Sequence, residues 1–159
     1  MTRFLLALCS FFSILSCSQS LPLTESEKKI IIEDISQTLS NYYNDIRKSG
    51  LNAEFKYLDS SSDFFWVPPG YSNAISYDSV AIILKQSAPK YRYIDNKFVS
   101  LQIIPLTKEL ATYTGSLQSA MTDTSGNVLT ISLIETGVII KRQEGWKLLS
   151  GQTSICTPK

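Results

Sequence analysis

The sequence contains no histidine. Histidine is the usual base at neutral pH and the commonest metal ligand, so Ser-His-Asp and Cys-His nucleophilic sites are excluded. The cysteines, Cys9, Cys17 and Cys156, have no paired spacing and therefore offer no zinc site. The seven glycines form no G-x-G-x-x-G or G-K-[ST] motif, which argues against a phosphate-binding loop. We expect neither a metal nor a cofactor.

The chain also lacks an excess of charge of either sign. Lysine and arginine number 15, aspartate and glutamate number 14, and the leading segment holds only one of these charges, Arg3. Nucleic acid is therefore not an expected partner, and residues 90–93, in which basic and aromatic side chains alternate, are expected to form a strand with one wet face. A hydrophobic fraction of 43% in 159 residues is enough for the core of one domain.

Residues 1–17 are typical of an export signal. Arg3 is followed by an uncharged apolar run of about 13 residues, shorter than the roughly 20 needed to span a bilayer. The run ends in Ile-Leu-Ser-Cys, which resembles the lipobox of bacterial lipoproteins and implies lipid attachment at Cys17. The expected location is the bacterial cell envelope, with the domain anchored to a membrane on its periplasmic or outer-surface side. The alternative is ordinary cleavage after Ser18 or Ser20 and a freely secreted product.

One domain is expected over residues 24–156, after a short linker over residues 18–23. The run Thr24-Glu25-Ser26-Glu27 has the pattern of a capping box, which predicts the start of a helix. Apolar residues then recur every three or four positions, and Gly50 is expected to end the helix. The apolar stripe of this long helix consists of Ile31, Ile35, Leu39, Tyr42 and Ile46.

The rest of the chain reads as short elements followed by long strands. Short strands are expected at 55–58 and 64–67, and a second helix from Ser76 to about Ser87. Long strands separated by turns follow at 91–105, 110–122, 128–142 and 146–155. This order predicts an α+β fold in which a long N-terminal helix and a second short helix pack on a strongly curved antiparallel sheet.

The final hairpin carries a family resemblance. Residues 141–154, with a glycine turn and the run Trp-Lys-Leu-Leu, resemble the last hairpin of the nuclear transport factor 2-like (SnoaL-like, cystatin-like) superfamily. Residues 64–67 and Gly70 resemble its early strand and turn. The resemblance implies a cone-shaped fold, but it fixes no function, because this fold carries isomerases, dehydratases, cyclases, transport adaptors and proteins without known activity. Ser150 and Gln152 stand where relatives often carry histidine.

A curved sheet over a long helix encloses a cavity into which alternate strand residues point. Strict alternation along the last strand places Trp146, Leu148, Ser150, Gln152 and Ser154 on one side. If that side is concave, Gln152 contributes a polar group to the cavity. Aromatic residues of the first helix, the early turn and the first long strand are expected to form a wall for a flat, apolar ligand, or else to fill the core. These candidates are Tyr42 or Tyr43, Trp66, Tyr71 and Tyr93.

Two functions remain open at this stage. The first is a non-catalytic module that binds a small apolar molecule or another protein. Apolar residues on both faces of the strand at 128–134 favour a homodimer through the sheet face. The alternative is an isomerase, dehydratase or cyclase, for which resemblance to ketosteroid isomerases implies Tyr42 as hydrogen-bond donor and Asp63 or Glu135 as the carboxylate.

Overall fold

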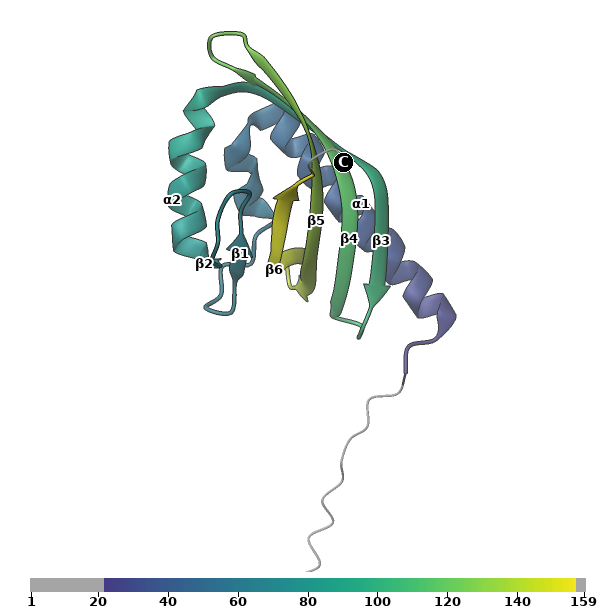
Figure 1. The fold of residues 1–159 in the computed structure, drawn as a ribbon. Helices are drawn as coiled ribbons and strands as arrows, with labels where there is room; N and C mark the ends of the chain where they lie inside the picture. Colours follow the sequence, from purple (N-terminus) through teal and green to yellow (C-terminus); the bar gives the residue numbers. More distant parts are fainter. Residues whose placement is uncertain (1–21, 157–159) are drawn as a thin grey trace, which may run out of the picture.

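The structure is a computed structural model that describes residues 22–156 (Figure 1). The predicted export signal and the lipidation site at Cys17 lie outside the described residues, so both stay predictions. Among residues 22–156, no helix has the length and apolar character needed to span a membrane.

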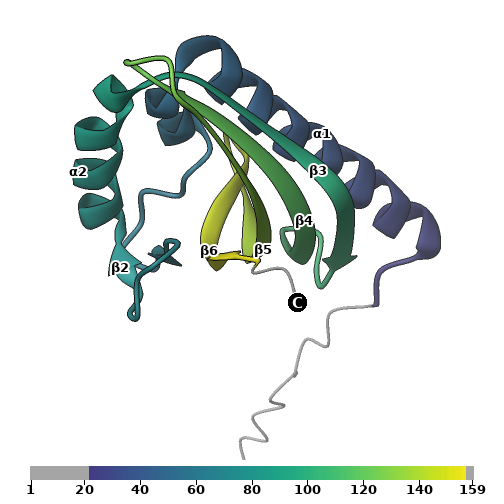
Figure 2. The ribbon, with the colours of Figure 1, turned by 45° about the horizontal axis from the view of Figure 1, so that its top comes forward.

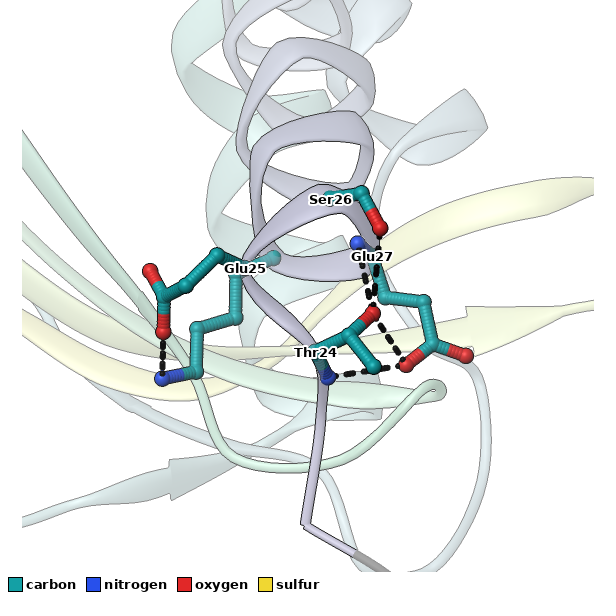
Figure 3. Close-up of polar contacts among 5 residues, drawn as sticks. Thr24, Glu25, Ser26 and Glu27 are labelled. Carbon is teal, nitrogen blue, oxygen red and sulfur yellow. Dashed lines mark hydrogen bonds and ion pairs between the residues drawn. The ribbon is translucent and has the colours of Figure 1, made fainter.

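The first helix, α1 (Glu25–Ser49), begins as the capping box predicts. The hydroxyl oxygen of Thr24 accepts from the backbone N–H of Glu27 at 3.3 Å, and Glu27 Oε2 accepts from the backbone N–H of Thr24 at 2.9 Å (Figure 3). Lys108 forms an ion pair with Glu27 at 2.7 Å, and the hydrogen bonds that Glu27 accepts from Lys108 and then from Thr24 lower its pKa to about 2. At the other end Gly50 adopts a φ of 77°, in the left-handed region that favours glycine. The predicted long helix is confirmed.

The segment after α1 forms a 3₁₀ helix, η1 (Leu51–Lys56), where a strand was expected at 55–58. That prediction is wrong because the backbone closes local hydrogen bonds, such as Tyr57 N to Glu54 O at 2.8 Å, in place of a strand ladder. Leu58 makes only an isolated bridge to Leu148. The short elements that follow are β1 (Phe65–Val67), β2 (Ile75–Ser76), α2 (Tyr77–Ser87) and η2 (Ala88–Lys90).

The long strands form most of a six-stranded sheet in the order β2-β1-β6-β5-β4-β3. They are β3 (Tyr91–Pro105), β4 (Leu110–Asp123), β5 (Val128–Arg142) and β6 (Gly145–Ile155). Figure 2 shows these strands bending together, with α1 along β3 and α2 near the opposite edge of the sheet. The α+β fold class is confirmed, although β1 pairs with β6 in parallel, so the sheet is not wholly antiparallel.

Along the long strands, residues that face the core alternate with residues that face outward, and one bulge shifts this alternation on β6. On β4 and β5 the odd-numbered residues face the core. The register then passes from Ile139–Leu148 to Val138–Ser150, which leaves Leu149 as an extra residue on β6. Beyond this bulge the inward positions of β6 change parity.

Glycines on the inner face make room for aromatic rings. Gly137 and Gly151 are paired across β5 and β6. A Cβ atom on Gly151 would lie 2.7 Å from two ring carbons of Trp66, closer than carbon atoms can approach. A Cβ on Gly115 would likewise lie 2.5 Å from the ring of Phe98. The missing side chains therefore let these two rings lie against the strand backbone.

Candidate functional site

A cavity of about 210 Å³ lies between the helical elements α1, η1 and α2 and the inner face of the sheet. Most of its wall is apolar. The aliphatic and phenyl part of that wall is formed by Leu58, Phe64, Val80, Ile83, Leu84, Leu117, Leu133 and Leu148. The groups that can form hydrogen bonds belong to Tyr42, Tyr43, Glu54, Trp66, Asn96, Glu135 and Thr153. No lysine or arginine of residues 22–156 lines the cavity.

Glu135, on the inner face of β5, is held by three hydroxyl donors. Its Oε1 accepts from the hydroxyls of Tyr43 at 3.0 Å and Tyr113 at 2.8 Å. Its Oε2 accepts from the Thr153 hydroxyl at 3.2 Å, and Thr153 in turn accepts from the indole N–H of Trp66 at 3.1 Å. Only 6% of Glu135 is exposed, and this burial raises its pKa, while the three hydrogen bonds oppose the rise. The carboxylate is thus tied directly to three side chains and, through Thr153, to Trp66.

Glu54, on η1, is held by a single donor. Its Oε2 accepts from the Tyr42 hydroxyl at 2.8 Å, and the carboxyl group lines the cavity. Burial raises the pKa of Glu54 to about 7, although the hydrogen bond from Tyr42 opposes the rise and the charge of Glu135 adds to it. Glu54 therefore changes its protonation state close to neutral pH.

Asn96, on β3, brings an unsatisfied acceptor to the same cavity. Its Oδ1 is buried and has no hydrogen-bond partner within residues 22–156. Leaving such an oxygen without a partner costs about 1–3 kcal/mol, so a donor that reached it would recover stability here. Asn96 is therefore a candidate ligand contact.

The structure brings three of the predicted site residues together and separates the others. Tyr42, Trp66 and Glu135 line the cavity, and Tyr43, the alternative to Tyr42, lines it as well. Tyr71 does not line it: this side chain lies beyond β1 in a turn closed by its backbone N–H to Pro68 O and is 47% exposed.

Tyr93, Gln152 and Asp63 also lie outside the cavity. The inward residues of this part of β3 are Ile94, Asn96 and Phe98, so Tyr93 faces the other way and is 44% exposed. The bulge at Leu149 turns Gln152 outward, opposite Thr136, and leaves its side chain exposed. Asp63 is exposed and lies in a separate hollow beside Arg142.

Sequence reasoning missed Glu54, Asn96 and Thr153. Asn96 had a readable signal, because it alternates with apolar Ile94 and Phe98 at the period of a strand. Thr153 had none, since its inward position depends on an extra residue that pattern reading does not reveal. Glu54 was missed because a strand was expected at 55–58, and that expectation did not predict the 3₁₀ helix η1 that places Glu54 at the cavity.

Comparisons with known proteins agree with this architecture. A family model for the SnoaL-like domain matches residues 35–158. A putative dehydratase of the nuclear transport factor 2-like family from Streptomyces avermitilis has a similar structure, with a TM-score of 0.69 at 16% identity, covering 82% of this chain and 99% of that one. A putative scytalone dehydratase from Novosphingobium aromaticivorans gives a TM-score of 0.73 at 9% identity, covering 84% and 89%.

A hexachlorocyclohexane dehydrochlorinase is also similar, with a TM-score of 0.67 at 10% identity, covering 84% of this chain and 90% of that one. At such low identities these structures show the fold alone. No match was found among curated proteins. The family model spans well over half of the sequence and ends on the hairpin that carried the resemblance, so the chain belongs to the SnoaL-like domain family.

Proposed function

We propose that the domain binds a small, largely apolar molecule in the cavity beside Glu54. The observation that carries this proposal is a partly open cavity with an apolar wall, lined by Asn96, whose buried Oδ1 has no hydrogen-bond partner within residues 22–156. A volume of about 210 Å³ is larger than the roughly 150 Å³ of an apolar cavity that holds one benzene molecule. Drug-sized sites are larger, roughly 300–1,000 Å³, so the expected ligand is one small ring or a short branched chain.

The cavity can be blocked from α2 without altering the catalytic or hydrogen-bonding groups. Ile83 lines the cavity, whereas its neighbour Ile82 is 56% exposed. We expect Ile83→Trp to weaken binding of 2-phenylethanol at least about tenfold, measured by saturation-transfer NMR. Ile82→Trp introduces the same side chain on the outer surface of the helix and should bind as the wild type does. Equal binding by wild type and Ile83→Trp would contradict the proposal.

A second candidate function is proton transfer, and the protonation behaviour of Glu54 favours it. A carboxyl group with a pKa of about 7 is matched to general acid–base work at neutral pH, and Tyr42 orients it. Such a pair suits an isomerase, dehydratase or cyclase, and two of the similar structures are described as putative dehydratases. In this proposal Glu54 replaces Asp63 as the carboxylate that works with Tyr42, since Asp63 lies outside the cavity.

The two functions are separated by hydrogen exchange on a ketone. Phenylacetone in D₂O would exchange its α protons when the Glu54 carboxylate removes one and a deuteron returns to the same carbon. We expect Glu54→Gln to slow this exchange by about 10²–10⁴-fold if the site is catalytic. Exchange at equal rates with and without the wild-type protein would leave binding as the function.

We also propose that the domain is exported and held at a bacterial membrane through lipid on Cys17. The support is the sequence of residues 1–17 alone. Cys17→Ser should move the protein from the membrane fraction to the soluble fraction, and mass spectrometry of the wild type should find the added lipid. The homodimer through the outer sheet face stays a prediction, which exposed Ile104 and Ile134 on that sheet support.

A further inference from the structure

The hydroxyl and indole donors of the cavity wall are already committed. The Tyr42 hydroxyl donates to Glu54 and the Tyr43 hydroxyl to Glu135. The indole N–H of Trp66 donates to Thr153, whose hydroxyl donates onward to Glu135. A ligand that enters therefore meets none of these hydroxyl or indole donors in a free state.

The free hydrogen-bonding capacity of the cavity is on the acceptor side. Asn96 Oδ1 is buried without a partner in the described part of the chain. Glu54 receives one hydrogen bond, at Oε2, although a carboxylate has about four lone-pair positions. Glu135 differs, because three donors already occupy its oxygens. A molecule that brings hydrogen-bond donors of its own would complement these acceptors.

The charge of the wall points in the same direction. Two carboxyl groups line the cavity, and no lysine or arginine of residues 22–156 lies in its wall to balance them. An anionic ligand would meet like charge in a partly desolvated space, which is unfavourable. The rings of Tyr42, Phe64 and Trp66 also line the cavity, and aromatic rings attract cations placed over their faces.

We propose that the cavity selects a small organic amine, with its ammonium group beside Glu54 and Asn96 and its hydrocarbon part against the leucine and aromatic wall. This inference rests on the proposed binding function and names its ligand class. The ammonium supplies up to three donors for the free acceptors and one positive charge to balance the carboxyl groups of the wall.

Three probes with one hydrocarbon body test the choice: 2-phenylethylamine, 2-phenylethanol and phenylacetate. The measurement is the dissociation constant of each by titration NMR at pH 8, where Glu54, with a pKa of about 7, is mostly ionised. An alkylammonium stays protonated there, as lysine does up to about pH 10. We expect the amine to bind at least about tenfold more tightly than the alcohol, because its hydrogen bond is charge-assisted, and phenylacetate to bind most weakly.

Two glutamate variants identify the source of the preference. Glu54→Gln keeps the size of the side chain and removes its charge, so the amine should lose its advantage over the alcohol. Glu33→Gln makes the same change on the exposed face of α1 and should leave the preference intact. Ile83→Trp should abolish binding of the amine, which excludes attachment to surface acids.

The outcomes separate this inference from the function on which it rests. If the alcohol or phenylacetate binds as tightly as the amine, and Ile83→Trp blocks that binding, the amine inference is overturned while the binding function stands. If the preference for the amine persists in Glu54→Gln, the inference is overturned as well. If Ile83→Trp changes the binding of none of the three probes, the proposed function itself fails.

Discussion

Glu135 and Glu54 share one cavity but differ in what holds them. Glu135 projects from β5, which is paired with β4 on one side and β6 on the other, and three hydroxyl groups donate to it. Glu54 projects from the short helix η1 and receives one donor. A carboxylate that accepts from several groups of the protein belongs to the framework. A carboxylate with capacity to spare can serve a ligand.

The strongest test of this comparison is to truncate each carboxylate. Glu135→Ala removes the acceptor of Tyr43, Tyr113 and Thr153 and leaves buried donors without partners, so we expect a loss of about 3–5 kcal/mol in the free energy of unfolding. Glu54→Ala leaves one donor, that of Tyr42, and should cost about 1 kcal/mol. Urea denaturation of both variants and the wild type measures the difference. Equal losses would show that the two carboxylates do the same structural work.

A second test uses pH, because Glu54 has a raised pKa. Near pH 4.5, the usual value for a glutamate, the unfolded chain begins to release this proton, whereas the folded chain holds it up to about pH 7. The folded state therefore binds more protons in that range, and stability falls as pH rises from 4.5 to about 7 and is level above it.

Urea denaturation at pH 5 and pH 8 should show this loss in the wild type and less of it in Glu54→Gln. One pKa unit corresponds to about 1.4 kcal/mol, and the half-buried position of Glu54 reduces the effect to about 1–2 kcal/mol in total. Burial raises the pKa of Glu135 too, but Glu135 is present in both proteins, so its effect cancels in their difference. Identical pH profiles for the two proteins would contradict the assignment to Glu54.

The framework half of this comparison was largely readable in the sequence. The capping box at Thr24 and the spacing of Ile31, Ile35 and Leu39 predicted α1, because a helix buries residues every three or four positions. The long strands followed from alternation and from turn residues between them. Glu135 could be named because it lies at an alternating position on one of these strands.

The half that faces a ligand was less readable, for physical reasons. The position of Glu54 depends on the chain reversal after Gly50 and on local 3₁₀ hydrogen bonds, neither of which leaves a periodic pattern. Gln152 was expected inside because strict alternation was extended through β6, where Leu149 is an extra residue. After a bulge, each following residue of the strand points to the face of the sheet opposite to the one that strict alternation predicts. Sequence pattern alone therefore placed Gln152 on the inner face, where Thr153 lies.

The smallest expected effects test whether Thr153, and not Gln152, lies on the inner face of β6. Thr153→Val keeps the shape of the side chain but removes the hydroxyl that links Trp66 to Glu135, so we expect a loss of about 1–2 kcal/mol in the free energy of unfolding. Gln152→Ala changes an exposed side chain opposite Thr136 and should stay within about 0.5 kcal/mol of the wild type. Urea denaturation measures both, and the tryptophan fluorescence of the folded protein, to which Trp66 and Trp146 contribute, should respond to the first change alone. A larger loss for Gln152→Ala than for Thr153→Val would indicate that β6 alternates strictly and that Gln152, not Thr153, points inward. Glu135 would then have only its two tyrosine donors.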